Sequence, residues 1–395
     1  MNNTGPASPL SAGSNIFLRA LSGMAAMSAR RVLAAPSLAP LPCIMAHHGS
    51  AALRPEHTLA AYARAIADGA DHIEPDLVPT RDGVLVARHE SQITDTTDIA
   101  TCPEYATRLR TQTIDGITRT DWFTTDFTLT ELRPLCAHER LPAIRPANTR
   151  HDGHFDIPTF QGIIDFVAAE AATCGRMIGL IPEIKNATHF RLLGFTPKET
   201  FLHTIAAHEY TRYCPLEVQS FETTPLCRLH GRVQAINPQA HLMLLMGERA
   251  EHVPDTMGTA TPLAFGDFMP PDDLRRVRDY ADVIGPSNKD IIPRDADGAW
   301  STPTSLIDDA HRAGLLVQSY TFRPENRFLP AQLRNTAGTM PETRRDQSQK
   351  SDAIWTWVLT ASLPMPRQRP PCPAGSGPPA IRPVSQAARA PAGSR

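Results

Sequence analysis

The amino-acid sequence predicts an α/β fold, and it favours a closed (β/α)8 TIM barrel over an open doubly wound sheet. Short apolar runs that suit buried strands alternate with amphipathic helical stretches over much of the 395 residues, which is typical of parallel strands joined by crossover helices. No GxGxxG or GxxxxGK[ST] turn follows a predicted strand, and this counts against a dinucleotide-binding or P-loop sheet.

The predicted elements follow one another along the chain in βα order. Strands are predicted at 42–47, 72–78, 84–89, 177–185, 216–221, 241–246, 281–286 and 315–322. Helices are predicted at 55–70, 128–136, 159–172, 198–208, 224–232, 271–280 and 303–313. The first of these helices has the clearest periodicity, with one apolar face made of Leu59, Tyr62, Ala63 and Ile66.

Three segments break the alternation. Residues 91–157 are polar and show little helical periodicity, so we predict an inserted cap over one end of the barrel rather than a second domain. Residues 1–41 form an N-terminal extension, either a targeting segment or a start assigned too far upstream. Residues 339–395 end in a Pro-, Arg-, Gly- and Ser-rich stretch, which predicts a disordered tail. The barrel is therefore assigned to residues 42–338.

The bulk composition excludes several classes of protein. A net charge of −2 without a dense basic stripe argues against a nucleic-acid binder. No apolar run reaches the length of a transmembrane helix. The seven cysteines form no CxxC pair, which excludes a zinc ribbon or a redox motif. The sequence leaves the oligomeric state open.

Acidic residues stand where two predicted strands end. Glu74 and Asp76 are two residues apart in a strand, so both side chains point to the same face. Side by side in a core, two carboxylates are costly unless a cation compensates them, and two solvated acids on a rim strand are the alternative. Together with Glu183 they form a set of oxygen ligands that suits a hard cation such as Ca²⁺ or Mg²⁺ rather than zinc.

Two imidazoles and an ammonium accompany these acids. His47 and His89 end their strands and offer a general base and a general acid. Lys185 shares a face with Glu183 and offers a cation to an anionic substrate group. A cation, an ammonium and paired imidazoles are what displacement at a phosphodiester requires. Each residue alone is more often structural, but their joint place at successive strand ends favours a site.

The stretch AHHGSAALRPEHTLAAYARAIADGADHIEPDLVPTRDGVLVARHE, residues 46–90, resembles the signature of the glycerophosphodiester phosphodiesterases, which usually begins A-H-R-G. The resemblance continues through IGLIPEIK, VQSFE and YTFRPENRFLP. It covers residues 42–338 and is closest to the longer, periplasmic-type branch of the family.

This resemblance implies a capped (β/α)8 barrel that hydrolyses a small-molecule glycerophosphodiester to glycerol 3-phosphate and an alcohol. It implies one divalent cation, Ca²⁺ in preference to Mg²⁺, held by residues matching Glu74, Asp76 and Glu183. His47 and His89 match the acid/base pair. Substrate contacts are assigned to His48, Glu56, Lys185, Gln219, Phe221 and Tyr320. The branch implies a periplasmic or secreted location, and a cytoplasmic one is the alternative.

Two rival hypotheses remain beside this one. The chain could be a catalytically impaired or non-catalytic binding protein derived from the barrel, although retention of all six central polar residues argues against it. It could also be a related enzyme that acts on larger lipids, but the sequence shows no amphipathic membrane-facing stretch.

His48 is a departure from the family pattern, which has Arg at this position. A histidine with an ordinary pKa is mostly neutral at neutral pH, whereas a guanidinium is always charged. We therefore expect weaker phosphate binding, and an activity that improves below neutral pH as His48 gains its charge, unless His89 must stay neutral there.

A second departure lies at the C-terminal end. The family closes its barrel with a last strand and a motif of the type G-(V/I)-D-G-F-F-T-D-x-P, which does not follow residue 338. One permitted encoding of WVLTASLPM, residues 357–365, spells G-V-D-G-F-F-T-D in another reading frame. We interpret the chain from about Met340 as frameshifted, by a lesion or by an error in the sequence. The last βα unit is then missing or replaced, and unpaired strand edges predict poor stability.

Overall fold

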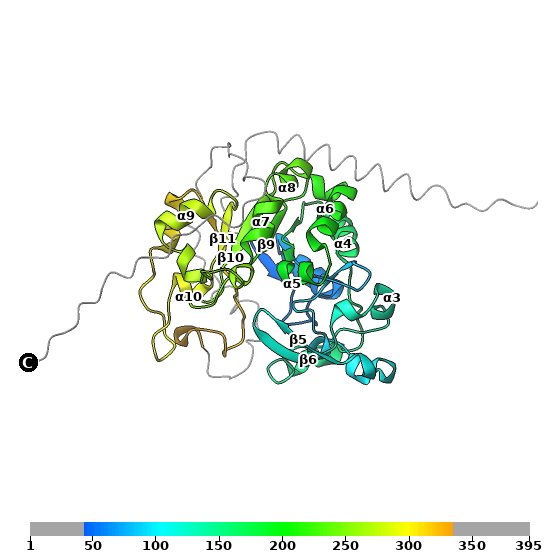
Figure 1. Cartoon of the computed structure of the whole chain (residues 1–395). Coiled ribbons are helices and arrows are strands. Elements are labelled where there is room, and N and C mark those ends of the chain that lie inside the picture. The colour runs from blue at the N-terminus through cyan, green and yellow to red at the C-terminus, as the bar shows by residue number, and fades with distance from the viewer. Residues whose placement is uncertain (1–42, 335–395) are drawn as a thin grey trace, which may run out of the picture.

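The computed structural model describes residues 43–334, which form parallel strands surrounded by helices (Figure 1). The parallel strands are β1 (Met45–His47), β2 (His72–Glu74), β3 (Asp76–Pro79), β7 (Gly179–Leu180), β8 (Glu183–Ile184), β9 (Glu217–Ser220), β10 (His241–Leu245), β11 (Val283–Gly285) and β12 (Leu316–Val317). The predicted extension 1–41, the tail 339–395 and the frameshift at Met340 lie outside the described residues.

The strands lie side by side in chain order. Pro75 separates β2 from β3, and Pro182 lies between β7 and β8, because a proline has no N–H to donate to the ladder. Parallel pairing joins β1 to β2, β2 and β3 to β7 and β8, and then β8, β9, β10, β11 and β12 in succession. Parallel neighbours in sequential order are the arrangement of a TIM barrel, which confirms the predicted fold class.

The barrel does not close within residues 43–334. β1 and β12 lie at opposite ends of the strand order, and no strand of the described chain pairs with the outer edge of either one. The predicted loss or replacement of the last βα unit concerns residues beyond 334, so it stays a prediction.

Helices cover the outer side of the strands. They are α2 (Leu59–Ala67), α4 (Phe160–Cys174), α5 (Ala187–Leu192), α6 (Pro197–Ala207), α7 (Thr223–Leu229), α8 (Arg232–Ile236), α9 (Pro271–Val277), α10 (Asn288–Ile291) and α11 (Leu306–Arg312). Thr58 caps α2 by accepting the N–H of Ala61. The core face of α2 contains Ala61, Tyr62, Ala65 and Ile66, whereas Leu59 is 37% exposed. The predicted apolar face was therefore rotated about the helix axis relative to the observed one. None of these helices is long and apolar enough to cross a membrane.

The insertion 91–157 contains no βα unit. It consists of short turns, the helix α3 (Leu129–Leu132) and the antiparallel hairpin β5–β6 (Arg110–Ile114, Ile117–Asp121). Its apolar side chains, among them Ile93, Phe127 and Leu132, form a cluster with Val78 of β3 and Val86 of β4 (Leu85–Ala87). The insertion therefore has a small core of its own that extends from the strand pair β3–β4.

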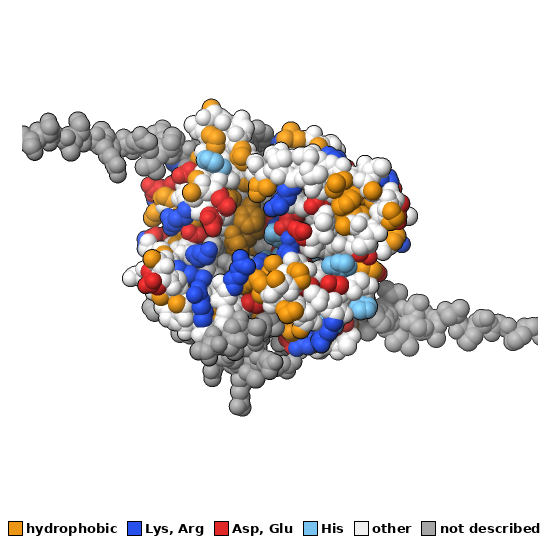
Figure 2. All heavy atoms as spheres, turned by 90° about the horizontal axis from the view of Figure 1, so that it is seen from below, with side chains coloured by type: hydrophobic (Ala, Val, Ile, Leu, Met, Phe, Trp, Pro, Cys, Tyr) orange, Lys and Arg blue, Asp and Glu red, His pale blue; other side chains and the backbone are white. Residues whose placement is uncertain are grey.

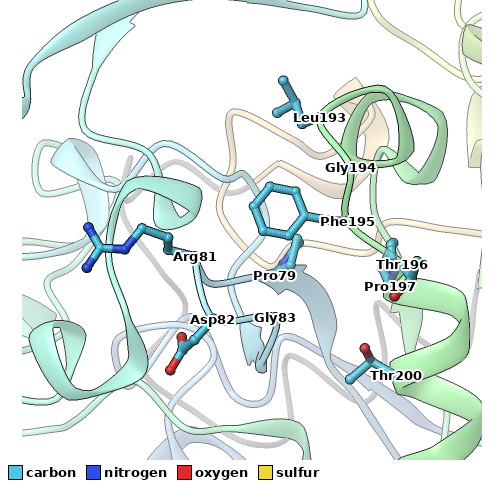
Figure 3. A pocket seen from close by; sticks show the side chains of 10 residues that line it. All are labelled: Pro79, Arg81, Asp82, Gly83, Leu193, Gly194, Phe195, Thr196, Pro197 and Thr200. Carbon is cyan, nitrogen blue, oxygen red and sulfur yellow. The ribbon is translucent and has the colours of Figure 1, made fainter.

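A pocket of about 320 Å³ lies between the turn after β3 and the start of α6 (Figure 3). None of the predicted site residues lines it. Its charged side chains already have partners, because Arg81 pairs with Glu131 at 2.9 Å and Asp82 accepts a hydrogen bond from Thr80. This pocket is therefore separate from the predicted site.

Candidate active site

Three carboxylates meet where β2 ends and where β3 and β8 begin. One ligand atom each of Glu74, Asp76 and Glu183 lies within 4.8 Å of the other two, and all three side chains are buried. The strand register explains this, because Asp76 of β3 lies opposite Glu183 of β8. The structure therefore brings together the three residues that the sequence predicted to lie near one another.

Hydrogen bonds orient two of these carboxylates. Gln219 donates to Oε1 of Glu74 at 2.6 Å, and the backbone N–H of His48 donates to its Oε2 at 3.0 Å. Lys185 donates to Glu183 at 3.0 Å, and its Nζ lies 3.7 Å from Oδ1 of Asp76. That Oδ1 atom is buried and has no hydrogen-bond partner. An oxygen left in this state fits a metal ligand.

The electrostatics of the three acids also fit a cation. Burial, followed by the charge of Asp76, raises the pKa of Glu74 well above its usual range. Burial raises the pKa of Glu183 to about 8, although Lys185 opposes the shift. Burial also acts to raise the pKa of Asp76, but Lys185 and His48 outweigh it and lower the pKa. A divalent ion among these oxygens would favour the ionised form of all three, and an all-oxygen set suits Ca²⁺ or Mg²⁺.

His48 is held as a cation next to this site. Its backbone has φ 58°, and its Nε2 lies 2.9 Å from Oδ2 of Asp76, while its Nδ1 lies 3.6 Å from Oε2 of Glu56. Burial acts to lower the pKa of His48, but Asp76 and Glu56 raise it to about 10. His48 is therefore charged at neutral pH. The expectation that it would gain its charge only below neutral pH is wrong.

The glycine after His48 permits this turn of the chain. Gly49 has φ 81°, and a Cβ atom there would come within 2.7 Å of the backbone of Ala61 in α2. A larger residue would meet both backbone strain and a steric clash. Gly49 thus lets the strand end approach the helix closely enough to turn His48 toward Asp76.

His57 is a site residue that the sequence did not reveal. Its Nε2 lies 3.0 Å from Oδ2 of Asp76, and its Nδ1 lies 3.0 Å from the hydroxyl of Tyr62. Burial, followed by the charge of His48, lowers the pKa of His57 to about 3, so its ring is neutral. The signal was its place in the motif, directly after Glu56.

The two predicted proton-transfer residues flank His48. The rings of His47 and His48 stack with 3.7 Å between centroids, and the ring of His89 lies 5.1 Å from that of His48. Burial and then the charge of His48 lower the pKa of His47. Burial and then Lys185 lower the pKa of His89, whose Nδ1 lies 2.6 Å from a carboxylate oxygen of Glu90. Both shifts favour the neutral ring, which can accept a proton, while the carboxylate of Glu90 can stabilise a proton on His89.

Aromatic side chains line the side of the site next to Lys185. The ammonium of Lys185 lies 5.7 Å from the ring centre of Phe221, which is 6.0 Å from the ring of Tyr320. Figure 2 looks onto the face below the strands of Figure 1 and shows a hollow with hydrophobic side chains inside it and charged and histidine side chains around it. Glu56, another predicted contact, is 5% exposed and is engaged by Arg140.

Comparisons with known proteins identify relatives of this chain. Residues 47–352 match the glycerophosphoryl diester phosphodiesterase family. The glycerophosphodiester phosphodiesterase GDPD6 of Arabidopsis thaliana is 34% identical over 73% of this chain and 76% of its own length. A glycerophosphodiester phosphodiesterase of Haemophilus influenzae is 25% identical over 79% of this chain and 83% of its own.

The fold has a solved counterpart. The structure of a Silicibacter pomeroyi protein assigned as a glycerophosphoryl diester phosphodiesterase superposes with a TM-score of 0.51 and 18% identity, over 80% of this chain and 94% of that one. Fold and acidic centre together define the class of protein, a phosphoric diester hydrolase built on a TIM barrel. The chain belongs to the glycerophosphoryl diester phosphodiesterase family.

Proposed function

We propose that this protein hydrolyses glycerophosphodiesters to glycerol 3-phosphate and an alcohol, with one divalent cation bound by Glu74, Asp76 and Glu183. The observation that supports this most directly is the convergence of these carboxylates with Lys185 and His48 at the strand ends. A bound cation would supply Lewis-acid stabilisation of the phosphoryl oxygens. The resemblance to the periplasmic-type branch favours Ca²⁺ over Mg²⁺.

The cationic side chains neutralise the substrate. Lys185 is buried beside Asp76 and Glu183, and His48 is charged, so both can stabilise negative charge that develops on phosphorus-bound oxygens. Phe221 and Tyr320 form an apolar wall that suits the carbon atoms of a small substrate. Gln219 keeps Glu74 oriented through its 2.6 Å hydrogen bond.

Two imidazoles in different protonation states exchange protons with the reactants. The neutral one removes a proton from the attacking water as the new P–O bond forms, and the other, which is protonated beforehand, gives its proton to the alkoxide as the P–O bond to the alcohol breaks. Glu90 stabilises a proton on His89, whereas the charge of His48 disfavours one on His47. We therefore assign His89 as the general acid, which holds a proton before the reaction, and His47 as the general base.

Turnover of glycerophosphocholine tests the proposal. Purified protein is mixed with the diester and with Ca²⁺ or Mg²⁺, and glycerol 3-phosphate is followed by ³¹P NMR. We expect metal-dependent release of glycerol 3-phosphate, with the higher rate in Ca²⁺. Tight binding of the diester without turnover would instead support the rival hypothesis of a non-catalytic binding protein.

A further inference from the structure

We propose that Arg140, a residue of the insertion, is a positioning residue that fixes the candidate acid/base histidine His89 and the candidate substrate contact His48 through one network of hydrogen bonds and ion pairs. This inference rests on the proposed function. It assigns the insertion a part in the chemistry in addition to its predicted role as a cap.

The guanidinium of Arg140 joins two acidic residues from separate loops. Its Nε and Nη2 atoms lie 2.8 and 2.6 Å from Oε1 of Glu56, in the loop before α2. Its Nη2 also lies 2.7 Å from Oε2 of Glu90, which follows β4. The side chain of Arg140 is 20% exposed, so solvent screens these pairs only in part.

Each of the two acids reaches a histidine on its other side. Oε1 of Glu90 lies 2.6 Å from Nδ1 of His89, and Oε2 of Glu56 lies 3.6 Å from Nδ1 of His48. Each acid therefore uses one oxygen for Arg140 and directs the other to an imidazole. If Arg140 were removed, both carboxylates would be free to rotate toward water.

This chain determines which atom of His89 can exchange a proton. An imidazole that donates its Nδ1–H to a carboxylate leaves Nε2 as the reactive atom and is stabilised when it becomes charged. Glu90 must remain ionised to act in this way. Burial acts to raise its pKa, but His89 and Arg140 hold that pKa at about 2. A planar guanidinium is suited to two carboxylates at once, whereas an ammonium is a point charge.

A purely structural role would not require Arg140, because another arginine attaches the insertion to the barrel. Arg145 pairs with Glu325, which follows β12, and donates to the carbonyl of Ala51 in the loop after β1. Neither partner of Arg145 belongs to the network of contacts that joins Arg140 to His89. Loss of Arg140 should therefore leave the insertion in place while His89 loses its orientation.

Steady-state kinetics of Arg140→Ala and Arg140→Lys test the inference with glycerophosphocholine. We expect Arg140→Ala to lower kcat by roughly ten- to hundredfold with a much smaller change in KM, as for other residues that orient a reacting group through a second residue. Arg140→Lys should restore part of kcat. Guanidinium chloride at low concentration should raise the rate of Arg140→Ala but not that of the wild type.

Arg119→Ala is the matched control, because it removes an exposed arginine from hairpin β5–β6 of the same insertion. It should leave kcat unchanged, and thermal unfolding should show that all variants are folded at the assay temperature. An unchanged kcat in Arg140→Ala, a loss that appears only in KM, or a loss that only follows the folded fraction would overturn the inference. An inactive wild type would instead contradict the proposed function itself.

Discussion

Buried carboxyl groups occupy two levels of the barrel and have very different partners. Glu74, Asp76 and Glu183 at the strand ends lie beside Lys185 and the charged His48. Glu217 begins β9, two residues before Gln219, and is 5% exposed. Among the described residues, its side chain accepts one hydrogen bond, from the neutral Gln318 at 2.8 Å, and its other oxygen has no partner.

The difference shows that burial alone does not make an acidic residue functional. Burial raises the pKa of Glu217 to about 8, because no nearby cation favours its charged form. Burial also acts to raise the pKa of Asp76, but Lys185 and His48 reverse the shift. A buried acid with cationic neighbours can bind and react, whereas one without them is a cost to folding.

The largest effect is expected from Asp76→Asn, which removes the charge at the centre of the strand-end cluster. Asp76 contacts His48, His57 and Lys185 and offers a free oxygen to a cation. We expect kcat/KM for glycerophosphocholine to fall by roughly a thousandfold. Glu217→Gln, which changes the buried acid at the start of β9, is the control and should keep its activity. Equal losses of kcat/KM in the two variants would contradict the claim that only the strand-end carboxylates are functional.

Chelation is expected to affect the strand-end cluster alone. Excess EDTA should abolish hydrolysis, and Ca²⁺ or Mg²⁺ should restore it. A cation at a hundredfold excess over its Kd should also raise the free energy of unfolding by about 3 kcal/mol, because it binds only the folded protein. Calorimetry of Asp76→Asn should show no such stabilisation. Full activity after EDTA treatment would refute a metal at this place.

Glu217→Gln is expected to stabilise the protein in a pH-dependent manner. The folded state keeps a proton on Glu217 up to about pH 8, whereas the unfolded chain releases it near 4.5. The wild type therefore loses stability as the pH rises between these two values, at about 1.4 kcal/mol for each pH unit. Urea unfolding at pH 4.5, 6 and 8 should show a difference from the variant that grows over this window. A constant difference would mean that Glu217 ionises normally.

The smallest effect is expected from His48→Arg. The pKa of His48 is raised to about 10, so its charge stabilises the fold below its ordinary pKa and is lost only as the pH rises through that higher value. His48→Arg should thus keep most of the activity, with an unchanged pH–rate profile between about pH 6 and pH 8. His48→Gln, which lacks the charge, is the contrast. A wild-type rate that rises below pH 7 and becomes flat in His48→Arg would restore the original expectation.

Much of the barrel could be predicted because its strands and helices have strong local signals. The described parallel strands fall within predicted apolar runs, except that β3 extends one residue further to Pro79. The helix predicted at 159–172 is observed as α4, with Thr159 as its N-cap. The strand predicted at 315–322 is observed as β12, which has only two residues. β12 lies at the edge of its sheet, and no further strand of the described residues pairs with that edge. A strand whose neighbouring strand is short or absent loses hydrogen-bond partners along that edge. The sequence of the strand itself does not show which neighbour it will have.

The insertion was predicted less well, although one local signal was present. Its hairpin turns at Asp115 and Gly116, which have φ values of 49° and 80°. An Asp-Gly pair between strand-like residues is a typical signal for a hairpin with two positive φ angles. Long-range ion pairs decide the position of the insertion on the barrel, and the pairing of Arg145 with Glu325 spans 180 residues. No local pattern predicts such a contact.

The sequence by itself determined the class of fold, the three acids on two strands and the pair of histidines at strand ends. It could do so because side-chain direction in a strand alternates with a period of two and parallel strands end at one edge. Only the tertiary structure decided the ionisation of His48, the presence of His57 beside Asp76 and the link from Arg140 to His89. These depend on burial and on charges brought together from distant parts of the chain, and electrostatic energy follows distance in space rather than in sequence.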